Sequence, residues 1–387
     1  MKSFRSQRIG IVIDAPNVLR LIVYFIVVML ILFICIGTLT SLKPEYRLSS
    51  SSVHNWTKKM TGESLVHFFS YENPYFSQAL PDDYVSPKLT SMIFESATNI
   101  NFDDPRSFLG RELPYFSIYD GEILVAGEGT DYTNMPFESA PPIEVLLQER
   151  EASLESLKES DKPKPSPVLT TNGKNVVFLY HTHSRESYLP HLPNAKTGDE
   201  AYHHEVNVTM VGERLKQELE ARGIGTVVDK TDFTQNILSK GIHYSRSYDE
   251  SRPVIKQAIN NNKDLQYFFD IHRDWQTKDN TTVTINEEKY ARTFFVIGGE
   301  HAKYEKNLQL AKTMHQLLDE KYPGLSRGIT TKQGQGTNGK FNQDLSENAL
   351  VIEMGGVENS LDEVYRTTEA LADVFAEYYW QAEKVSQ

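Results

Sequence analysis

Residues 176–189 read V-V-F-L-Y-H-T-H-S-R-E-S-Y-L, an apolar run followed at once by a cluster of polar side chains. The run V-V-F-L-Y has the length and the β-branched and aromatic content of a buried strand. His181, His183 and Glu186 follow it within one turn of chain, and these residue types bind metal ions in proteins. The stretch therefore predicts a strand whose end carries part of a metal site.

The composition limits both the class of protein and the chemistry of that site. A chain of 387 residues is long enough for two or three domains. A net charge of −12 argues against a nucleic-acid-binding protein, because phosphate contacts need a basic surface. The single cysteine, Cys35, lies in the most apolar segment, so a zinc site elsewhere must use histidine and carboxylate ligands.

Residues 18–42 are that apolar segment, and they predict one transmembrane helix. About 20 uncharged residues follow Arg20, which is the length a helix needs to cross a bilayer. A cleaved signal peptide is the alternative, but its apolar stretch is only about 7 to 15 residues long and ends in small residues. The basic residues of segment 1–17 keep that segment in the cytoplasm under the positive-inside rule, so the remainder of the chain is expected outside the membrane.

The chain after the span divides into three regions. Residues 44–140 have a mixed composition without evident chemistry and predict a small α+β spacer domain near the membrane. Residues 141–172 form a charged segment ending in D-K-P-K-P-S-P, and alternating prolines are typical of a stiff, extended linker. Residues 173–387 form the C-terminal domain.

Strand and helix patterns alternate along that C-terminal domain. Strands are predicted over 176–180, 224–229, 265–271, 291–297 and 349–353. Helices are predicted over 206–221, 251–261 and 304–322, and from Ser360, where Glu363 stands at capping-box spacing. This alternation predicts the α/β class, with an open mixed sheet flanked by helices.

Two further predicted strands end in residues that could bind a metal ion or accept a proton. His272, preceded by Asp270 and followed by Arg273, ends the strand over 265–271, and Glu353 ends the last strand. Ligands of open α/β sheets gather beyond the carboxyl ends of the strands, so these side chains are expected near the first motif. A zinc hydrolase needs about three nitrogen or oxygen ligands, an open water position and a carboxylate that accepts the proton of the water.

The geometry of H-T-H leaves the number of histidine ligands open. Residues two apart face the same side of a strand, so His181 and His183 could both bind if the strand continues through them. If the chain turns after Tyr180, only one of them need bind.

Three motifs resemble one known family. The motifs are L-Y-H-T-H-S-R-E-S-Y, F-D-I-H-R-D and F-N-Q-D-L-S-E-N-A-L-V-I-E-M-G-G, in this order behind one membrane span. They are similar to stage II sporulation protein P of endospore-forming bacteria, a family grouped with the zinc-dependent N-acetylmuramoyl-L-alanine amidases. The resemblance covers nearly the whole C-terminal domain and implies an amidase-like fold and a bound Zn²⁺.

The resemblance also implies roles for single residues. His183 and His272 correspond to metal ligands, and Glu353 corresponds to the catalytic general base. The third ligand stays open: Glu186 ranks first, His203 second and Glu205 third, because H-H-E-V-N places a histidine where the broader amidases carry a glutamate.

Remaining positions are assigned supporting roles. His181 is expected as a structural neighbour of the ligands. Arg273, Asn342 and Gln343 are candidates for holding the substrate, since the acidic and amide groups of a stem peptide need such partners.

The resemblance further implies a biological setting. The substrate is peptidoglycan, with hydrolysis of the muramoyl-L-alanine amide and a second, endopeptidase activity on peptide crosslinks. The implied partners are stage II sporulation proteins D and M, acting in engulfment of the forespore in the space between the mother-cell and forespore membranes. Two other classes stay open: a non-catalytic module that binds the cell wall or another partner, and a different metal-dependent hydrolase of the H-x-H type.

Overall fold

The computed structural model describes residues 24–25, 27–29, 66–67, 69–70, 72–80, 121–136, 140–155, 157, 167–333 and 337–386. The chain divides into two compact units, Met1–Phe102 and Asp103–Gln387. The first unit contains the 3-10 helix η2 (Pro74–Ala79). The second unit contains the sheet and all of the candidate site residues.

The predicted membrane span lies almost entirely outside the described residues. Of residues 18–42 the structure describes 24–25 and 27–29, which are helical. No helix in the described part of the chain is long and apolar enough to cross a bilayer. The span over 18–42 therefore stays a prediction.

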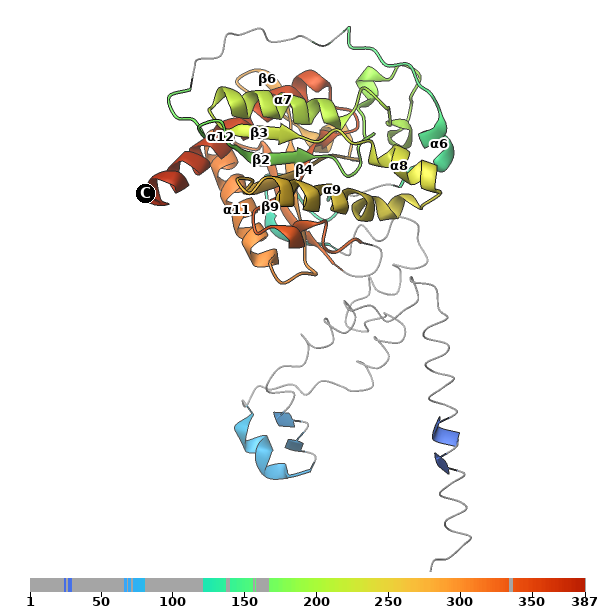
Figure 1. Cartoon of the computed structure of the whole chain (residues 1–387), viewed down its shortest axis with the longest axis vertical. Coiled ribbons are helices and arrows are strands. Elements are labelled where there is room, and N and C mark those ends of the chain that lie inside the picture. Colours follow the sequence, from blue (N-terminus) through green and yellow to red (C-terminus); the bar gives the residue numbers. More distant parts are fainter. Residues whose placement is uncertain are drawn as a thin grey trace, which may run out of the picture. The chain divides into compact units, whose positions relative to one another are not determined.

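The second unit is built on a seven-stranded sheet with the strand order β1-β8-β7-β9-β4-β2-β3 (Figure 1). Its strands in chain order are β1 (Gly121–Ala126), β2 (Asn175–Tyr180), β3 (Gly225–Val228), β4 (Tyr267–Asp274), β7 (Thr293–Gly298), β8 (Ser326–Lys332) and β9 (Ala349–Gly356). The parallel pairs are β2 with β3, β2 with β4, β4 with β9 and β7 with β8. The pairs β7 with β9 and β1 with β8 are antiparallel, so the predicted mixed sheet is confirmed.

Helices cover both faces of this sheet (Figure 1). The principal helices are α7 (Val208–Ala221), α8 (Phe233–Lys240), α9 (Ser247–Asn261), α11 (Tyr304–Lys321) and α12 (Leu361–Ser386). Short elements complete the fold: α6 (Ile143–Leu147), α10 (Lys278–Thr281), the hairpin β5 (Thr282–Ile285) and β6 (Glu288–Ala291), and the 3-10 turns η4 (Leu189–His191), η5 (Gly198–Glu200), η6 (Tyr244–Arg246) and η7 (Gln343–Leu345).

Alternation along the strands assigns each side chain to one of two cores. Phe269 and Ile271 of β4 join the large core with α7, α11 and α12, whereas Phe268 packs with Ile255 of α9 on the other face. Successive side chains of a strand point to opposite faces, so Asp270 and His272 share the α9 face with Phe268. This alternation decides where the candidate site lies.

Local signals explain the ends of the helices. The predicted capping box at α12 is confirmed, because Ser360 Oγ accepts from the Glu363 N–H at 3.4 Å and Glu363 Oε2 accepts from the Ser360 N–H at 3.1 Å. At α7, Asn207 Oδ1 accepts from the Thr209 N–H at 2.9 Å. Gly241, with a φ of 62°, ends α8 in the left-handed region that favours glycine.

The structure corrects the predicted division between spacer and C-terminal domain. Composition predicts a separate domain over residues 44–140, but Gly121–Ala126 pairs with β8 and forms an edge of the main sheet. Strand partners far away in sequence leave no trace in local composition. The strand β8 itself, the helix α8 and the hairpin are likewise absent from the sequence-based prediction.

The predicted linker is also partly corrected. Residues 161–166, with the alternating prolines, lie outside the described residues. The preceding segment packs on the domain: Leu146 of α6 is buried against Tyr202 and Tyr244. The Ser153 N–H donates to the His191 carbonyl at 2.9 Å. Apolar side chains in the charged sequence thus hold this part of the segment against the domain.

Candidate metal centre

The turn after β2 brings His183 and Glu186 to one place. The strand ends at Tyr180, and the Glu186 N–H donates to the His183 carbonyl at 3.0 Å, which closes a turn. The two side chains then meet, with His183 Nδ1 lying 3.2 Å from Glu186 Oε1. Since the chain turns at this point, the case in which His181 and His183 share one strand face does not arise.

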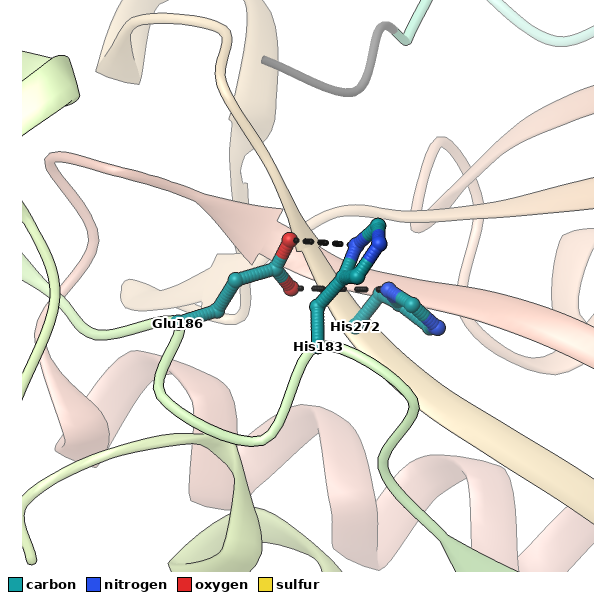
Figure 2. Close-up of side chains that lie close together, drawn as sticks. All are labelled: His183, Glu186 and His272. Atoms are coloured by element: carbon teal, nitrogen blue, oxygen red, sulfur yellow. Dashed lines mark hydrogen bonds and ion pairs between the residues drawn. The ribbon is translucent and has the colours of Figure 1, made fainter. Parts of the chain in front are cut away.

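The neighbouring strand β4 supplies His272 to the same place. His272 Nδ1 lies 3.5 Å from Glu186 Oε2, and the rings of His183 and His272 are 4.8 Å apart in an edge-to-face arrangement. Figure 2 shows the Glu186 carboxylate extended toward both imidazoles, one oxygen to each. The first-ranked candidate ligands therefore form one group, defined here as the triad His183, Glu186 and His272.

The triad fits a tetrahedral metal ion. One donor atom from each of the three side chains can be chosen so that all lie within 4.8 Å of one another. Bonds of about 2.0 to 2.2 Å to a tetrahedral zinc ion space its ligand atoms by roughly 3.3 to 3.6 Å. His183 Nδ1 and His272 Nδ1 each lie close to this distance from a Glu186 oxygen, at 3.2 Å from Oε1 and 3.5 Å from Oε2. Two imidazoles and one carboxylate are also a donor set found in catalytic zinc sites.

Burial and charge at the triad favour a bound cation. His183, Glu186 and His272 are 4%, 4% and 0% exposed. Burial opposes ionisation of Glu186, but hydrogen bonds from His183 and His272 outweigh it and hold the pKa of the carboxyl below its ordinary value. Burial likewise disfavours the imidazolium of His272, yet Asp270 and Glu186 raise its pKa. The surroundings thus stabilise positive charge where the ion would lie.

Glu353 lies beside the triad in the sheet. In the parallel pair of β4 and β9 it is the register partner of His272, so both side chains stand on the α9 face. Its side chain is 2% exposed. A carboxylate at this position has the placement required of a general base next to a metal centre.

The chain is similar to known proteins over nearly its whole length. The sequence model of the family described as stage II sporulation protein P (SpoIIP) matches residues 103–376. Stage II sporulation protein P of Bacillus subtilis (strain 168) is 47% identical over 387 residues, covering 99% of this chain and 96% of that protein. The chain belongs to the stage II sporulation protein P family. The family resemblance of its three motifs is thereby confirmed.

Similarity to solved structures is weaker. A metallo-carboxypeptidase from Burkholderia cenocepacia aligns with a TM-score of 0.33 and 12% sequence identity, covering 56% of this chain and 60% of that chain. A TM-score of this size carries no conclusion about the SpoIIP chain.

His181 has a different environment from its neighbour in H-T-H. Its Nδ1 lies 3.1 Å from the Asp229 carbonyl at the end of β3, and burial lowers the pKa of the imidazole to about 4. A Cβ added at Gly212 of α7 would lie 2.3 Å from His181 Nε2, so this ring packs directly against the helix. His181 is therefore a buried residue of the β2–α7 packing that lies outside the triad.

The second- and third-ranked ligand candidates lie outside the triad. His203 Nε2 donates to the Arg150 carbonyl, 2.9 Å away, because His203 Nδ1 accepts from the N–H groups of Glu205 and Val206. Nδ1 thus binds backbone in the loop before α7 and Nε2 binds the Arg150 carbonyl, so the structure does not bring His203 to the triad. The Glu205 side chain is 78% exposed and lies 3.7 Å from His204, so it does not reach the triad either.

Arg273, a substrate-binding candidate, makes structural contacts with its side chain. It lies on the sheet face opposite to His272, because β4 continues through Asp274. Its guanidinium donates to the carbonyls of Ser187 and Ala201, at 2.9 and 3.1 Å. Its backbone N–H donates to Glu186 Oε2 at 3.0 Å, so only the main chain of Arg273 contacts the triad.

Asn342 and Gln343, the other substrate-binding candidates, also make structural contacts with their side chains. Asn342 Nδ2 donates to the Tyr248 carbonyl and to Ser251 Oγ, both at 3.0 Å. Gln343 is 0% exposed. It accepts from the Gly298 N–H at 2.9 Å and donates to the Val296 carbonyl at 2.8 Å. These amides connect η7 to its neighbours.

Replacing Gln343 tests this structural role. We expect Gln343→Ala to destabilise the protein by about 2 to 4 kcal/mol, because two buried backbone groups lose their partners. Thermal unfolding of the purified full-length protein measures the change, and the substrate KM is expected to stay at the wild-type value. The exposed Gln381→Ala serves as a control that changes stability by less than about 0.5 kcal/mol. An unchanged melting temperature with a raised KM would contradict the structural assignment.

Two tyrosines at the triad have no counterpart in the sequence-based prediction. Tyr244 of η6 stacks on His183 with ring centroids 4.8 Å apart, and Tyr248 of α9 lies 6.2 Å from His272 with nearly parallel rings. Both are buried. They fix one side of the two imidazoles. Their segment reads Y-S-R-S-Y and carries no motif that points to the site.

Proposed function

We propose that this SpoIIP family member is a zinc-dependent peptidoglycan hydrolase that cleaves the amide between the N-acetylmuramoyl lactyl group and L-alanine. The observation that supports this most strongly is the triad of His183, Glu186 and His272 beside Glu353 in the adjacent strand. Three ligands and one carboxylate are the minimum set for metal-assisted hydrolysis of an amide.

Each residue has one task in the proposed mechanism. His183, His272 and Glu186 hold the zinc ion, which when bound lowers the pKa of water and polarises the scissile carbonyl. Glu353 accepts the proton of the attacking water and later donates it to the nitrogen of the leaving L-alanine. Tyr244 and Tyr248 keep the two imidazole rings in place. The low exposure of the triad excludes bulk water, so its charges interact strongly.

Products of digestion test this function. Purified full-length protein is incubated with purified peptidoglycan, and the soluble fragments are analysed by mass spectrometry. We expect stem peptides that carry a free L-alanine amine, together with glycan that has lost its peptides. Fragments with glycan still attached, released only by cleavage of crosslinks, would identify an endopeptidase. An absence of new fragments from zinc-loaded protein would contradict hydrolysis.

Metal content separates the enzyme from the binding-module alternative. A hydrolase of this kind holds close to one zinc ion per chain and loses its activity with a chelator. A module that only binds the cell wall needs no zinc, and a chelator leaves its binding unchanged. Other metal-dependent hydrolases of the H-x-H type use more histidine and aspartate ligands, and the described residues contain no further group of this kind around the triad.

The proposed setting follows from the predicted span. The SpoIIP family is a sporulation family, and residues 18–42 would anchor the hydrolase in a membrane with its C-terminal unit on the outer side. During engulfment this places it in the space between the mother-cell and forespore membranes. Stage II sporulation proteins D and M are the proposed partners, and co-purification of the three proteins from detergent extracts of sporulating cells tests this.

A further inference from the structure

Asp270 is a buried carboxylate next to the triad. It lies in β4 two residues before His272, so both side chains stand on the same sheet face. Asp270 Oδ1 is 3.0 Å from His272 Nε2, and the Asp270 side chain is 0% exposed. The other ring nitrogen of His272, Nδ1, lies 3.5 Å from Glu186 Oε2 in the triad. Asp270 therefore contacts the outer edge of the imidazole that binds the ion.

Thr182, which belongs to the H-T-H motif, holds the Asp270 carboxylate with two hydrogen bonds. Its N–H donates to Asp270 Oδ1 at 2.8 Å, and its hydroxyl donates to Asp270 Oδ2 at 2.6 Å. Ser251 Oγ lies 2.9 Å from the same hydroxyl. Thr182 is 0% exposed and immediately precedes His183 in the chain. The pair of Thr182 and Asp270 thus joins the loop that carries His183 to the strand that carries His272.

We propose that Asp270, held by Thr182, is a positioning residue whose carboxylate, 3.0 Å from His272 Nε2, fixes the orientation of the imidazole so that Nδ1 faces the metal. This rests on the proposed function, because it takes the triad as a zinc site. A carboxylate that accepts the outer N–H of a metal-binding histidine orients the ring and makes it a stronger ligand. Thr182 of H-T-H and Asp270 of F-D-I-H then share one role, which is to orient His272.

Zinc affinity tests the proposal without relying on hydrolysis. Zn²⁺ alone is titrated into metal-free full-length protein against a chromophoric chelator. We expect Thr182→Val to weaken binding by about 10-fold and Asp270→Ala by up to about 100-fold, since outer partners of metal ligands typically contribute this much. Thr182→Ser keeps the hydroxyl and is expected to bind within about twofold of wild type.

A matched control separates positioning from general stability. Thr367 is also 0% exposed, and its hydroxyl donates to the carbonyls of Ala291 and Glu363, at 2.5 and 3.1 Å. Thr367→Val is expected to lower the melting temperature without changing zinc affinity. If Asp270→Ala fails to fold, the comparison of Thr182→Val with Thr367→Val still tests the proposal. Each of these variants only replaces a hydroxyl with a methyl group of similar size.

The outcomes of the titration are distinct. Wild-type zinc affinity in Thr182→Val, or in a folded Asp270→Ala, would overturn the positioning role and leave the proposed hydrolase intact. Wild-type protein that binds no zinc would instead overturn the proposed function. Weak binding by Thr182→Val that Thr182→Ser does not restore would show that the hydroxyl is not the group responsible.

Discussion

His272→Ala should abolish both zinc binding and peptidoglycan hydrolysis. His272 is one of the three proposed ligands and is 0% exposed, so its removal leaves the ion with two protein ligands in a buried position. Water cannot easily replace the imidazole there without also disturbing Asp270, whose Oδ1 lies 3.0 Å from His272 Nε2. We expect less than about one tenth of the wild-type zinc content, and a loss of hydrolysis of at least about 10³-fold.

Zinc content by elemental analysis and the rate of peptide release measure this prediction. His315→Ala is the matched control, because His315 is another buried histidine, with its Nδ1 2.7 Å from Ser326 Oγ. Circular dichroism checks that both variants are folded. Removal of zinc from wild-type protein with a chelator should give the same loss, and added Zn²⁺ should restore the activity. Normal hydrolysis by folded, zinc-free His272→Ala would refute a metal-dependent reaction.

Glu353→Gln should keep zinc but lose hydrolysis. The amide has nearly the volume of the carboxylate, so the packing of β9 beside His272 is preserved, but the amide cannot accept a proton from water. Loss of a general base lowers rates by about 10²- to 10⁴-fold. We therefore expect a large fall in kcat with zinc content unchanged, which separates this residue from the ligands.

Rates of peptide release and zinc content again provide the measurements for this variant. Glu218→Gln is the matched control, since Glu218 is also a buried glutamate but pairs with Arg214 and Arg222 on α7. It should hydrolyse at the wild-type rate. A Glu353→Gln protein that releases L-alanine peptides as fast as wild type would assign the proton transfer to another group.

Part of the candidate site could be predicted because it depends on local sequence. A strand followed by H-T-H-S-R-E places His183 and Glu186 three residues apart, and a single turn then brings their side chains together. His272 and Glu353 end strands of the same sheet, and ends of parallel strands meet at one edge. The motif F-D-I-H also indicated where Asp270 lies, because alternation along a strand places Asp270 on the same face as His272.

The substrate-binding candidates were chosen by residue type, which does not show which face of the sheet or which neighbours a side chain meets. The strand continues through Asp274, which turns Arg273 to the face opposite the triad. Asn342 and Gln343 are polar residues in a loop, but their amides are needed by backbone groups of other elements. Buried polar groups must find partners, and which partners they find depends on tertiary contacts.

The sequence by itself determined the family and the α/β alternation of the C-terminal domain, and it pointed to His183 and His272 with Glu186 first among three candidates for the third position, because motifs and hydrophobic periodicity are properties of neighbouring residues. Only the tertiary structure decided that β1 completes the sheet and that His203 binds backbone instead of metal. It also decided that Thr182 and Asp270 connect the two histidine motifs. The physical reason is the same in each case: strand pairing and buried hydrogen bonds join residues far apart in sequence, whose partners no local pattern specifies.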